Sequence, residues 1–221
     1  MNSITVDNSC WKLKFGESLL VVGSTNVGKS VFVERLLATP QLWEGKADNI
    51  MYCYAIENET AKRLSEKNSN IILHKGVPEN LGNPRQLFPQ GGNSILIFDD
   101  LQTQLESSRD YTQLLSVGNH HCGIFTICIG HSLFAESKER RLQCPHYSQI
   151  CLMQNRRCFH QIANLARQLG QNPALVQAAY KDACSQRFGY LILDVRNETP
   201  PELSVITNVF CEKNSPCYVY I

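Results

Sequence analysis

The sequence predicts an α/β fold in which a mostly parallel β-sheet is covered by helices and has a β-rich C-terminal edge. The first observation is a series of apolar runs that suit buried parallel strands, at 18–22, 50–55, 94–98, 124–129 and 149–153. The second is that polar segments with helical spacing separate these runs, as crossover connections require. The third is a pair of later apolar runs, 189–195 and 203–210, which predict two closing strands at one edge.

The apolar run at 18–22 leads into a glycine-bounded loop and then into a helix. The loop has the G-x-x-x-x-G-K-S form of a phosphate-binding P-loop, formed by Gly23, Ser24, Thr25, Asn26, Val27, Gly28, Lys29 and Ser30. Gly23 and Gly28 allow turns and close approach that a Cβ would obstruct, so backbone N–H groups can wrap a polyphosphate. The helix that follows directs its positive end at the phosphates. The motif in this setting predicts a P-loop NTPase fold.

Four residues of this chain are expected to act on a bound nucleotide. Lys29 is a compact cation expected to reach the β- and γ-phosphates of ATP, and the Ser30 hydroxyl is expected to hold Mg²⁺. The strand over 94–98 ends in Asp99 and Asp100, which is the Walker B pattern. Asp99 is predicted to support Mg²⁺ through its water shell, and Asp100 to orient or deprotonate the attacking water. The other interpretation is a pair of acids that caps the next helix.

Polar residues also follow the ends of two further predicted strands. His131 comes just after the run at 124–129, and in a parallel sheet it would lie beside the γ-phosphate, where a polar group can act as a sensor. The other interpretation is a histidine that only caps a loop by hydrogen bonding to the backbone. Glu57, Asn58 and Glu59 follow the strand over 50–55, at the edge where ligands gather in open α/β sheets.

The whole chain, residues 1–221, is expected to form a single domain. Within it, 1–16 is a lead-in strand segment in which Trp11, Leu13 and Phe15 alternate, and 155–221 is a helical and edge-strand part. The remaining predictions are a strand at 70–73, a loop with one helical turn at 76–92, and helices at 60–67, 106–117, 159–169 and 173–185.

Charge and hydropathy bound the environment in which the protein works. The formal net charge is +1, from 21 basic and 20 acidic residues, so no overall field attracts nucleic acid and DNA contact needs a local cluster or a ring assembly. Lys138, Arg140 and Arg141 form either such a cluster or a solvated helix face. No apolar run is long enough for a membrane span, and residues 1–14 lack the apolar centre of a signal peptide. We therefore expect an intracellular protein.

The cysteines do not indicate a disulfide scaffold or a zinc site. There are ten, scattered through apolar segments, and most are expected to be reduced and buried. Two Cys-x-His pairs, Cys144 with His146 and Cys158 with His160, lack the spacing of a zinc finger, knuckle or ribbon. We expect no metal at either pair.

The order of these motifs resembles the FtsK/HerA class of P-loop ATPases, specifically the small genome-packaging ATPases of Maverick/Polinton-type elements and related double-stranded DNA viruses. The resemblance runs from Leu19 to the end of the chain. Beyond the P-loop it rests on 52–54, 97–101, 120–124, 131–134, 155–157, 161–166, 179–183 and 189–194. It implies an ATP- and Mg²⁺-dependent motor that forms a homo-oligomeric ring, hexamer or pentamer, and moves double-stranded DNA into a capsid. Capsid portal or vertex proteins would be its partners, inside the infected host cell and in association with the virion.

Two positions depart from the family pattern. The family commonly ends the sensor strand with glutamine, where this sequence has His131. Cellular relatives often carry an arginine before that strand that acts on the nucleotide of a neighbouring subunit, and here the aligned position is His120. The resemblance therefore implies another trans arginine, with Arg157 (or Arg156) the first candidate and Arg109 the second.

Two other functions compete with the motor. A nucleoside or nucleotide kinase also begins with a P-loop, but it needs an acceptor pocket and usually an arginine-rich lid, and no convincing lid is present. A nucleotide-dependent assembly factor without turnover is the other alternative, and the intact set of Lys29, Ser30, Asp99 and Asp100 argues against it.

Overall fold

The computed structural model describes residues 2–7, 11–67, 70–133, 146–155, 159–211 and 216–221. Within these ranges, ten strands form one sheet in the order β1-β12-β11-β10-β9-β3-β8-β7-β5-β6, and β2 pairs with β4. The strands are β1 (Ser3–Thr5), β2 (Leu13–Lys14), β3 (Ser18–Val22), β4 (Trp43–Glu44), β5 (Asn49–Tyr54), β6 (Ile71–Lys75), β7 (Ser94–Asp99), β8 (Ile124–Gly130), β9 (Gln149–Met153), β10 (Tyr190–Asp194), β11 (Val205–Thr207) and β12 (Tyr218–Tyr220).

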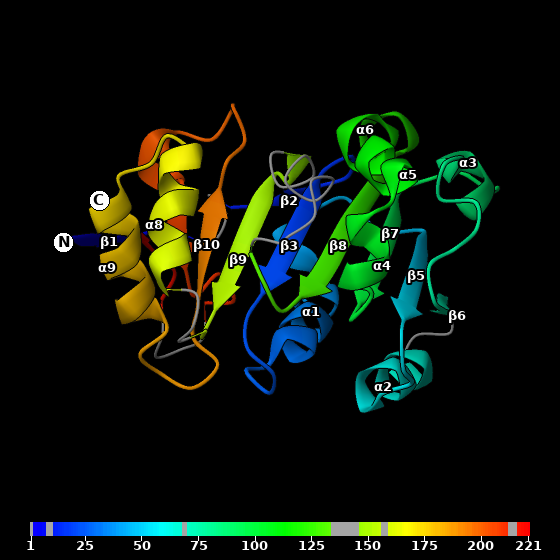
Figure 1. Ribbon diagram of the computed structural model, residues 1–221, viewed down its shortest axis with the longest axis horizontal. Coiled ribbons are helices and arrows are strands. Elements are labelled where there is room, and N and C mark those ends of the chain that lie inside the picture. The colour runs from blue at the N-terminus through cyan, green and yellow to red at the C-terminus, as the bar shows by residue number, and fades with distance from the viewer. Residues whose placement is uncertain (1, 8–10, 68–69, 134–145, 156–158, 212–215) are drawn as a thin grey trace.

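The sheet has a parallel part and an antiparallel edge. Strands β9, β3, β8, β7, β5 and β6 are parallel neighbours, whereas β10, β11, β12 and β1 continue the sheet with antiparallel pairing. In Figure 1 the arrows of β9, β3 and β8 point one way and that of β10 points the other way. The predicted mostly parallel, helix-covered sheet with a β-rich C-terminal edge is confirmed.

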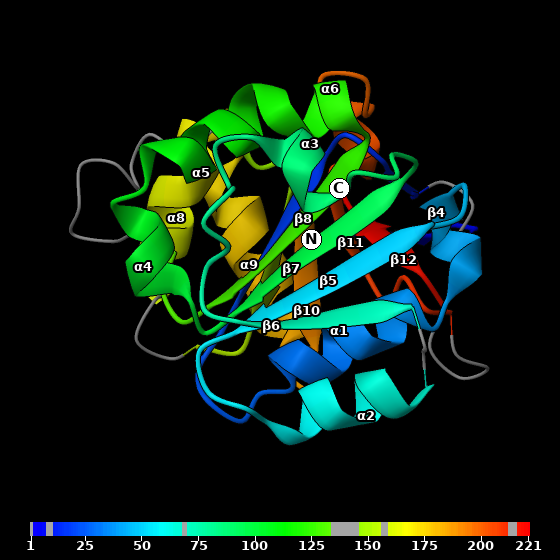
Figure 2. The same ribbon diagram turned by 90° about the vertical axis from the view of Figure 1, so that its right-hand side faces the viewer.

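Helices cover both faces of the sheet (Figure 2). They are α1 (Lys29–Leu37), α2 (Glu59–Lys67), α3 (Pro84–Leu87), α4 (Gln102–Glu106), α5 (Arg109–Gln113), α6 (Asn119–Cys122), α8 (Phe159–Gln168) and α9 (Pro173–Ala183), with short turns η2 (Pro40–Leu42), η3 (Leu114–Gly118) and η5 (Pro201–Leu203). Leu19 and Val21 of β3 pack in the core under α1 and α2, while Leu20 and Val22 pack in the core under α4, α5, α8 and α9. Alternate residues of a strand point to opposite faces, so one central strand serves both cores.

Two local predictions differ from the structure. The single helix expected at 106–117 is instead α4, α5 and the π-helical turn η3, because the Ser108 hydroxyl caps α5 by accepting a hydrogen bond from the Tyr111 N–H at 3.1 Å. The helical spacing of apolar residues predicted one continuous helix here, but α4 ends and α5 begins within that range. The lead-in segment was expected to be extended, and β2 lies there with Leu13 buried, but β1 and its pairing with β12 were not predicted.

Most of the cysteines that the structure describes are buried, as the sequence predicted. Free cysteines in the described ranges include five buried ones, Cys53, Cys128, Cys151, Cys184 and Cys217. Burial raises the pKa of the Cys53 thiol to about 12, so it stays protonated and packs as a small apolar side chain. Among the helices described, none has both the length and the apolar content needed to cross a bilayer.

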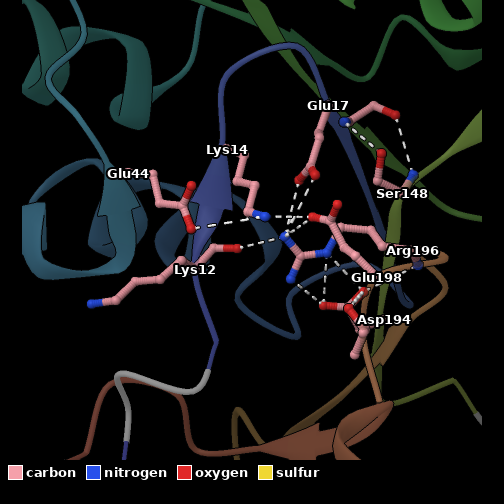
Figure 3. Close-up of polar contacts among 10 residues, drawn as sticks. Lys12, Lys14, Glu17, Glu44, Ser148, Asp194, Arg196 and Glu198 are labelled. Carbon is pink, nitrogen blue, oxygen red and sulfur yellow. Dashed lines mark hydrogen bonds and ion pairs between the residues drawn. The ribbon is translucent and has the colours of Figure 1, made fainter. Parts of the chain in front are cut away.

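An ion-pair network ties the chain together at the amino-terminal edge of the central strands (Figure 3). Arg196, about 10% exposed, pairs with Asp194 at 2.6 Å and with Glu17 at 3.3 Å. Asp194 lies opposite Gln149, the first residue of β9, and Glu17 directly precedes β3. The guanidinium therefore joins the antiparallel edge to the strand that carries the P-loop, from the end opposite to that loop.

Candidate active site

The P-loop lies between β3 and α1, at the carboxyl ends of the parallel strands. A Cβ on Gly23 would come within 2.8 Å of the Val27 side chain and 2.9 Å of Met153 Cβ on the neighbouring β9. Gly28 caps α1 with φ of 91° and Asn26 has φ of 63°, both in the left-handed region. The two glycines are thus needed for the compact turn, because a Cβ at either position would collide with a neighbouring side chain.

Lys29, near the end of the P-loop, has an almost completely buried side chain. Its ammonium donates hydrogen bonds to the carbonyl oxygens of Gly23 at 3.1 Å and Ser24 at 3.0 Å, and lies 3.3 Å from His131 Nδ1. Burial lowers the pKa of Lys29, whereas the nearby Asp100 and Asp99 act to raise it. Because an ammonium group has only donors, His131 Nδ1 must be the acceptor of this contact.

That contact fixes the tautomer of His131. With Nδ1 accepting from Lys29, the ring proton lies on Nε2, which donates to Asp100 Oδ1 at 2.9 Å. Asp100 has φ of 56°, and this turn directs its half-exposed carboxylate away from the line of β7. The structure thus brings Lys29, His131 and Asp100 together from α1, the end of β8 and the end of β7. The imidazole bonds to two side chains, which argues against the loop-capping interpretation.

Two further side chains hold the main chain of His131 in place. The His131 N–H donates to Gln102 Oε1 at 2.7 Å, and Asn155 Nδ2 donates to the His131 carbonyl at 3.3 Å. A Cβ on Gly130 would lie 2.5 Å from Gln102 Oε1, so a larger residue there would displace the Gln102 amide from this contact. Sequence reasoning assigned no role to Gln102. Its position just beyond the two acids, at the edge where strands end, was the available signal.

Asp99 is buried and holds a second group of polar contacts. Its Oδ2 accepts hydrogen bonds from the Tyr52 hydroxyl, from Asn58 Nδ2 at 3.0 Å and from Ser30 Oγ at 3.2 Å. Burial raises the pKa of Asp99, and the hydrogen bonds from these three partners act against that shift. Burial together with the charge of Asp99 raises the pKa of Tyr52, which keeps its hydroxyl a donor. The Asp99 carboxylate is therefore fixed beside Ser30.

Sequence reasoning missed Tyr52 as a site residue and named Asn58 only by its place after a strand. Tyr52 lies in the middle of β5 among apolar residues, so the sequence indicated only a buried core residue. The pairing of β5 with β7 brings it close to Asp99. Asn58 Oδ1 accepts from the Ala61 N–H at 2.9 Å at the start of α2, which turns Nδ2 toward Asp99. The hydroxyl of Ser30 and the carboxylate of Asp99 are hard oxygen ligands of the kind Mg²⁺ prefers, so the residues present fit a magnesium nucleotide.

Of the other residues named from the sequence, some lie outside the described ranges and two, Arg109 and His120, lie elsewhere in the fold. Arg156, Arg157, Lys138, Arg140, Arg141, Cys144 and Cys158 lie outside the described residues. Arg109 is exposed at the start of α5. His120 lies next to Gly16, at the amino end of β3 and thus at the sheet edge opposite the P-loop. In the part of the chain that the structure describes, no group of three histidine, cysteine or acidic side chains could hold a metal ion.

The sheet, the P-loop between β3 and α1, and the two acids at the end of β7 define a P-loop NTPase fold. Among solved structures, the chain is similar to B204, the DNA-packaging ATPase from Sulfolobus Turreted Icosahedral Virus, with a TM-score of 0.60 and 16% identity over 85% of this chain and 96% of that chain. A KaiC-like protein from Pyrococcus horikoshii OT3 has a TM-score of 0.47 and 12% identity over 94% of this chain and 90% of that chain. No family model and no curated protein sequence matches the chain.

Proposed function

We propose that the protein is a Mg²⁺-dependent ATPase that drives double-stranded DNA into a viral capsid. The observation that carries the ATPase is the meeting of Lys29, Ser30, Asp99, Asp100 and His131 at one edge of the sheet, beside the P-loop. These side chains come from three separate elements of the fold, and all of them meet at this edge. Such convergence of charged and hydroxyl groups on a phosphate cradle suits hydrolysis of a nucleoside triphosphate.

Each residue then has a distinct task. Lys29 donates hydrogen bonds to the β- and γ-phosphate oxygens and stabilises the charge on them. Ser30 and Asp99 would hold Mg²⁺, which when bound would neutralise part of the phosphate charge. Asp100 orients the attacking water and accepts its proton as the bond between the β–γ bridging oxygen and the γ-phosphorus breaks and ADP leaves. His131 holds Asp100 Oδ1, which leaves Oδ2 for the water.

The motor function rests on two kinds of support. The order of motifs resembles genome-packaging ATPases of the FtsK/HerA class, and the fold is similar to that of a viral DNA-packaging ATPase over most of both chains. Because the net charge is only +1, DNA contact needs a local basic cluster or assembly into a ring, and we propose a homo-oligomeric ring, hexamer or pentamer, that docks on capsid portal or vertex proteins. Arg157 is the proposed trans arginine. The ring would work inside the infected host cell and associate with the virion.

The experiment that tests the motor compares ATP hydrolysis with and without double-stranded DNA and measures the assembled mass in both conditions. We expect a weak ATPase as an isolated subunit, and a higher rate together with ring-sized mass when DNA is added. If DNA changes neither rate nor mass, the motor is wrong. Phosphoryl transfer to an added nucleoside, without an effect of DNA, would instead indicate a kinase.

Asp100→Asn is expected to keep ATP binding and to lower kcat by about 10²-fold, because the amide cannot accept a proton from the water. The neutral side chain still occupies the same position beside His131. Single-turnover phosphate release and equilibrium binding of ATP measure the two properties separately. Asp110→Asn, at the start of the exposed first turn of α5, is the matched control. A variant that loses ATP binding but retains its residual rate would contradict this role for Asp100.

Tyr52→Phe is expected to raise the Mg²⁺ concentration at half-maximal ATPase rate by about 10-fold, because it removes a hydrogen bond that fixes Asp99. The rate at saturating Mg²⁺ should change much less, since no group that touches ATP is altered. A Mg²⁺ titration of the ATPase rate measures the shift, with Tyr54→Phe on the same strand as the control. An unchanged Mg²⁺ requirement would show that Tyr52 only fills the core.

A further inference from the structure

A cavity of about 490 Å³ lies beside the P-loop, on the side away from the acids. It is lined by residues of α1, of the turn between α9 and β10, and of the segments around β11 and β12, including Arg35, Gln186, Phe188, Tyr190, Asn208 and Phe210. A volume of this size is in the range of small-molecule sites. Sequence reasoning assigned no function to any of these residues.

Phe188 connects this cavity to the P-loop. A Cβ on Gly28 would lie 2.8 Å from Phe188 Cδ1, so the aromatic ring rests directly against the loop at its second glycine. The ring lines the cavity and is 52% exposed, and the Arg187 guanidinium lies 4.7 Å from the ring centroid. The missing side chain at Gly28 therefore serves the approach of this ring as well as the phosphate turn.

The backbone holds Phe188 in this position at a conformational cost. Its φ is 64°, in the left-handed region that bulky residues rarely adopt. The next residue, Gly189, leaves no room for a side chain, because a Cβ there would lie 2.0 Å from the Ala183 carbonyl oxygen at the end of α9. Strained residues of this kind persist where the surrounding structure fixes them, often at ligand sites.

The sheet order decides which end of a nucleotide faces the cavity. Asp99, Asp100 and His131 lie at the ends of β7 and β8, on one side of β3. Phe188 lies two residues before β10, and Tyr190 pairs with Met153 at the end of β9, on the other side of β3. A nucleotide with its γ-phosphate toward the acids thus extends its nucleoside toward the cavity. Val31 on α1, 49% exposed, adds apolar surface close to Lys29 and Ser30.

We propose that this cavity holds the nucleoside of the nucleotide whose phosphates the P-loop binds, and that Phe188 stacks on its base. The inference rests on the proposed ATPase function and assigns the base of the nucleotide to this cavity and to Phe188. Tyr190 and Phe210 are among the lining residues and pack edge-on against Phe32 of α1, at 4.7 and 5.4 Å between ring centroids, and the Arg35 guanidinium lies 4.1 Å from the Phe210 ring centroid. The side-chain amides of Gln186 and Asn208 line the same space and supply donors and acceptors for the polar edge of a nucleoside.

The test compares two magnesium-loaded probes, ADP and inorganic tripolyphosphate, by equilibrium binding to the full chain. Phe188→Ala is expected to weaken ADP binding by about 10-fold through loss of base stacking and to leave tripolyphosphate binding unchanged. Phe188→Trp should retain ADP binding. Phe188→Asn removes the ring but adopts positive φ more readily, so it separates loss of stacking from loss of the turn. Val117→Ala, at an apolar residue 48% exposed on η3, is the matched control.

The outcomes separate this inference from the function on which it rests. Unchanged ADP binding in both Phe188→Ala and Phe188→Asn overturns the stacking role while leaving the ATPase in place. Equal weakening of ADP and tripolyphosphate in both variants also overturns it, because the ring would then only shape the phosphate loop. If the unmodified protein binds neither probe and hydrolyses no ATP, the proposed function fails and this inference fails with it.

Discussion

Lys29→Ala is expected to lower kcat/KM for ATP by about 10³-fold, the largest effect of any substitution in the site. Lys29 is 7% exposed, and its ammonium is directed into the loop by three hydrogen-bonding contacts. In such a desolvated position a positive charge stabilises phosphate oxygens far more than it would in water. Among the described residues, no other lysine or arginine is seen to contact the loop carbonyl groups in the place of Lys29.

The measurement is steady-state phosphate release over a range of ATP concentrations, with thermal unfolding as a check that the fold is kept. Lys62→Ala provides the control, since Lys62 is an exposed residue of α2 whose ion pair with Glu59 at 3.5 Å lies on the surface. Lys62→Ala should hydrolyse ATP at the normal rate. Normal turnover by Lys29→Ala would mean that the P-loop is not the site of hydrolysis.

Arg196→Met is expected to lower the free energy of unfolding by about 3–5 kcal/mol, because it leaves Asp194 and Glu17 without their cation. The Asp194 side chain is fully buried, so its carboxylate has little water to replace the guanidinium. For a chain of this length the loss corresponds to a fall in Tm of about 6–20 °C. Calorimetry or thermal circular dichroism measures it.

The pH dependence of that loss distinguishes charge from packing. Burial raises the pKa of Glu17, and Arg196 opposes the shift, so removing Arg196 raises the folded-state pKa further. An acid with a raised pKa contributes stability below its unfolded value, near 4.5, and loses it as pH rises through the folded value. Arg196→Met should therefore be most destabilised at neutral pH and less so near pH 4.5. Arg167→Met, on the exposed side of α8, should show neither effect.

The parts of this structure that the sequence predicted are those with local patterns. The P-loop has a fixed spacing, and the central parallel strands are continuous apolar runs, so the meeting of Asp99, Asp100 and His131 at one edge followed from the parallel arrangement. The order of strands within the sheet was not predicted, and it is the observed pairing of β3 with β8 that brings Lys29 close to His131.

The parts that could not be predicted depend on contacts between distant segments. Tyr52 looked like any buried aromatic residue of a strand, and only the pairing of β5 with β7 shows that its hydroxyl reaches Asp99. Arg196 and Glu17 are 179 residues apart in the chain. Ser3, Ile4 and Thr5 do alternate in polarity, but β1 is short and exposed, and its partner β12 lies at the other end of the chain, so the pairing had no local signal.

The hydrogen bonds from Lys29 to its own loop affect which anions the protein binds. A phosphate that reaches this ammonium exchanges partners with the carbonyl oxygens of Gly23 and Ser24, and with His131, rather than meeting an unoccupied cation. The loss of these internal hydrogen bonds offsets part of the gain from the new contact. A single phosphate or sulfate ion is thus a poor competitor. Only a chain of phosphates long enough to engage the loop N–H groups and Ser30 at the same time outcompetes the internal partners.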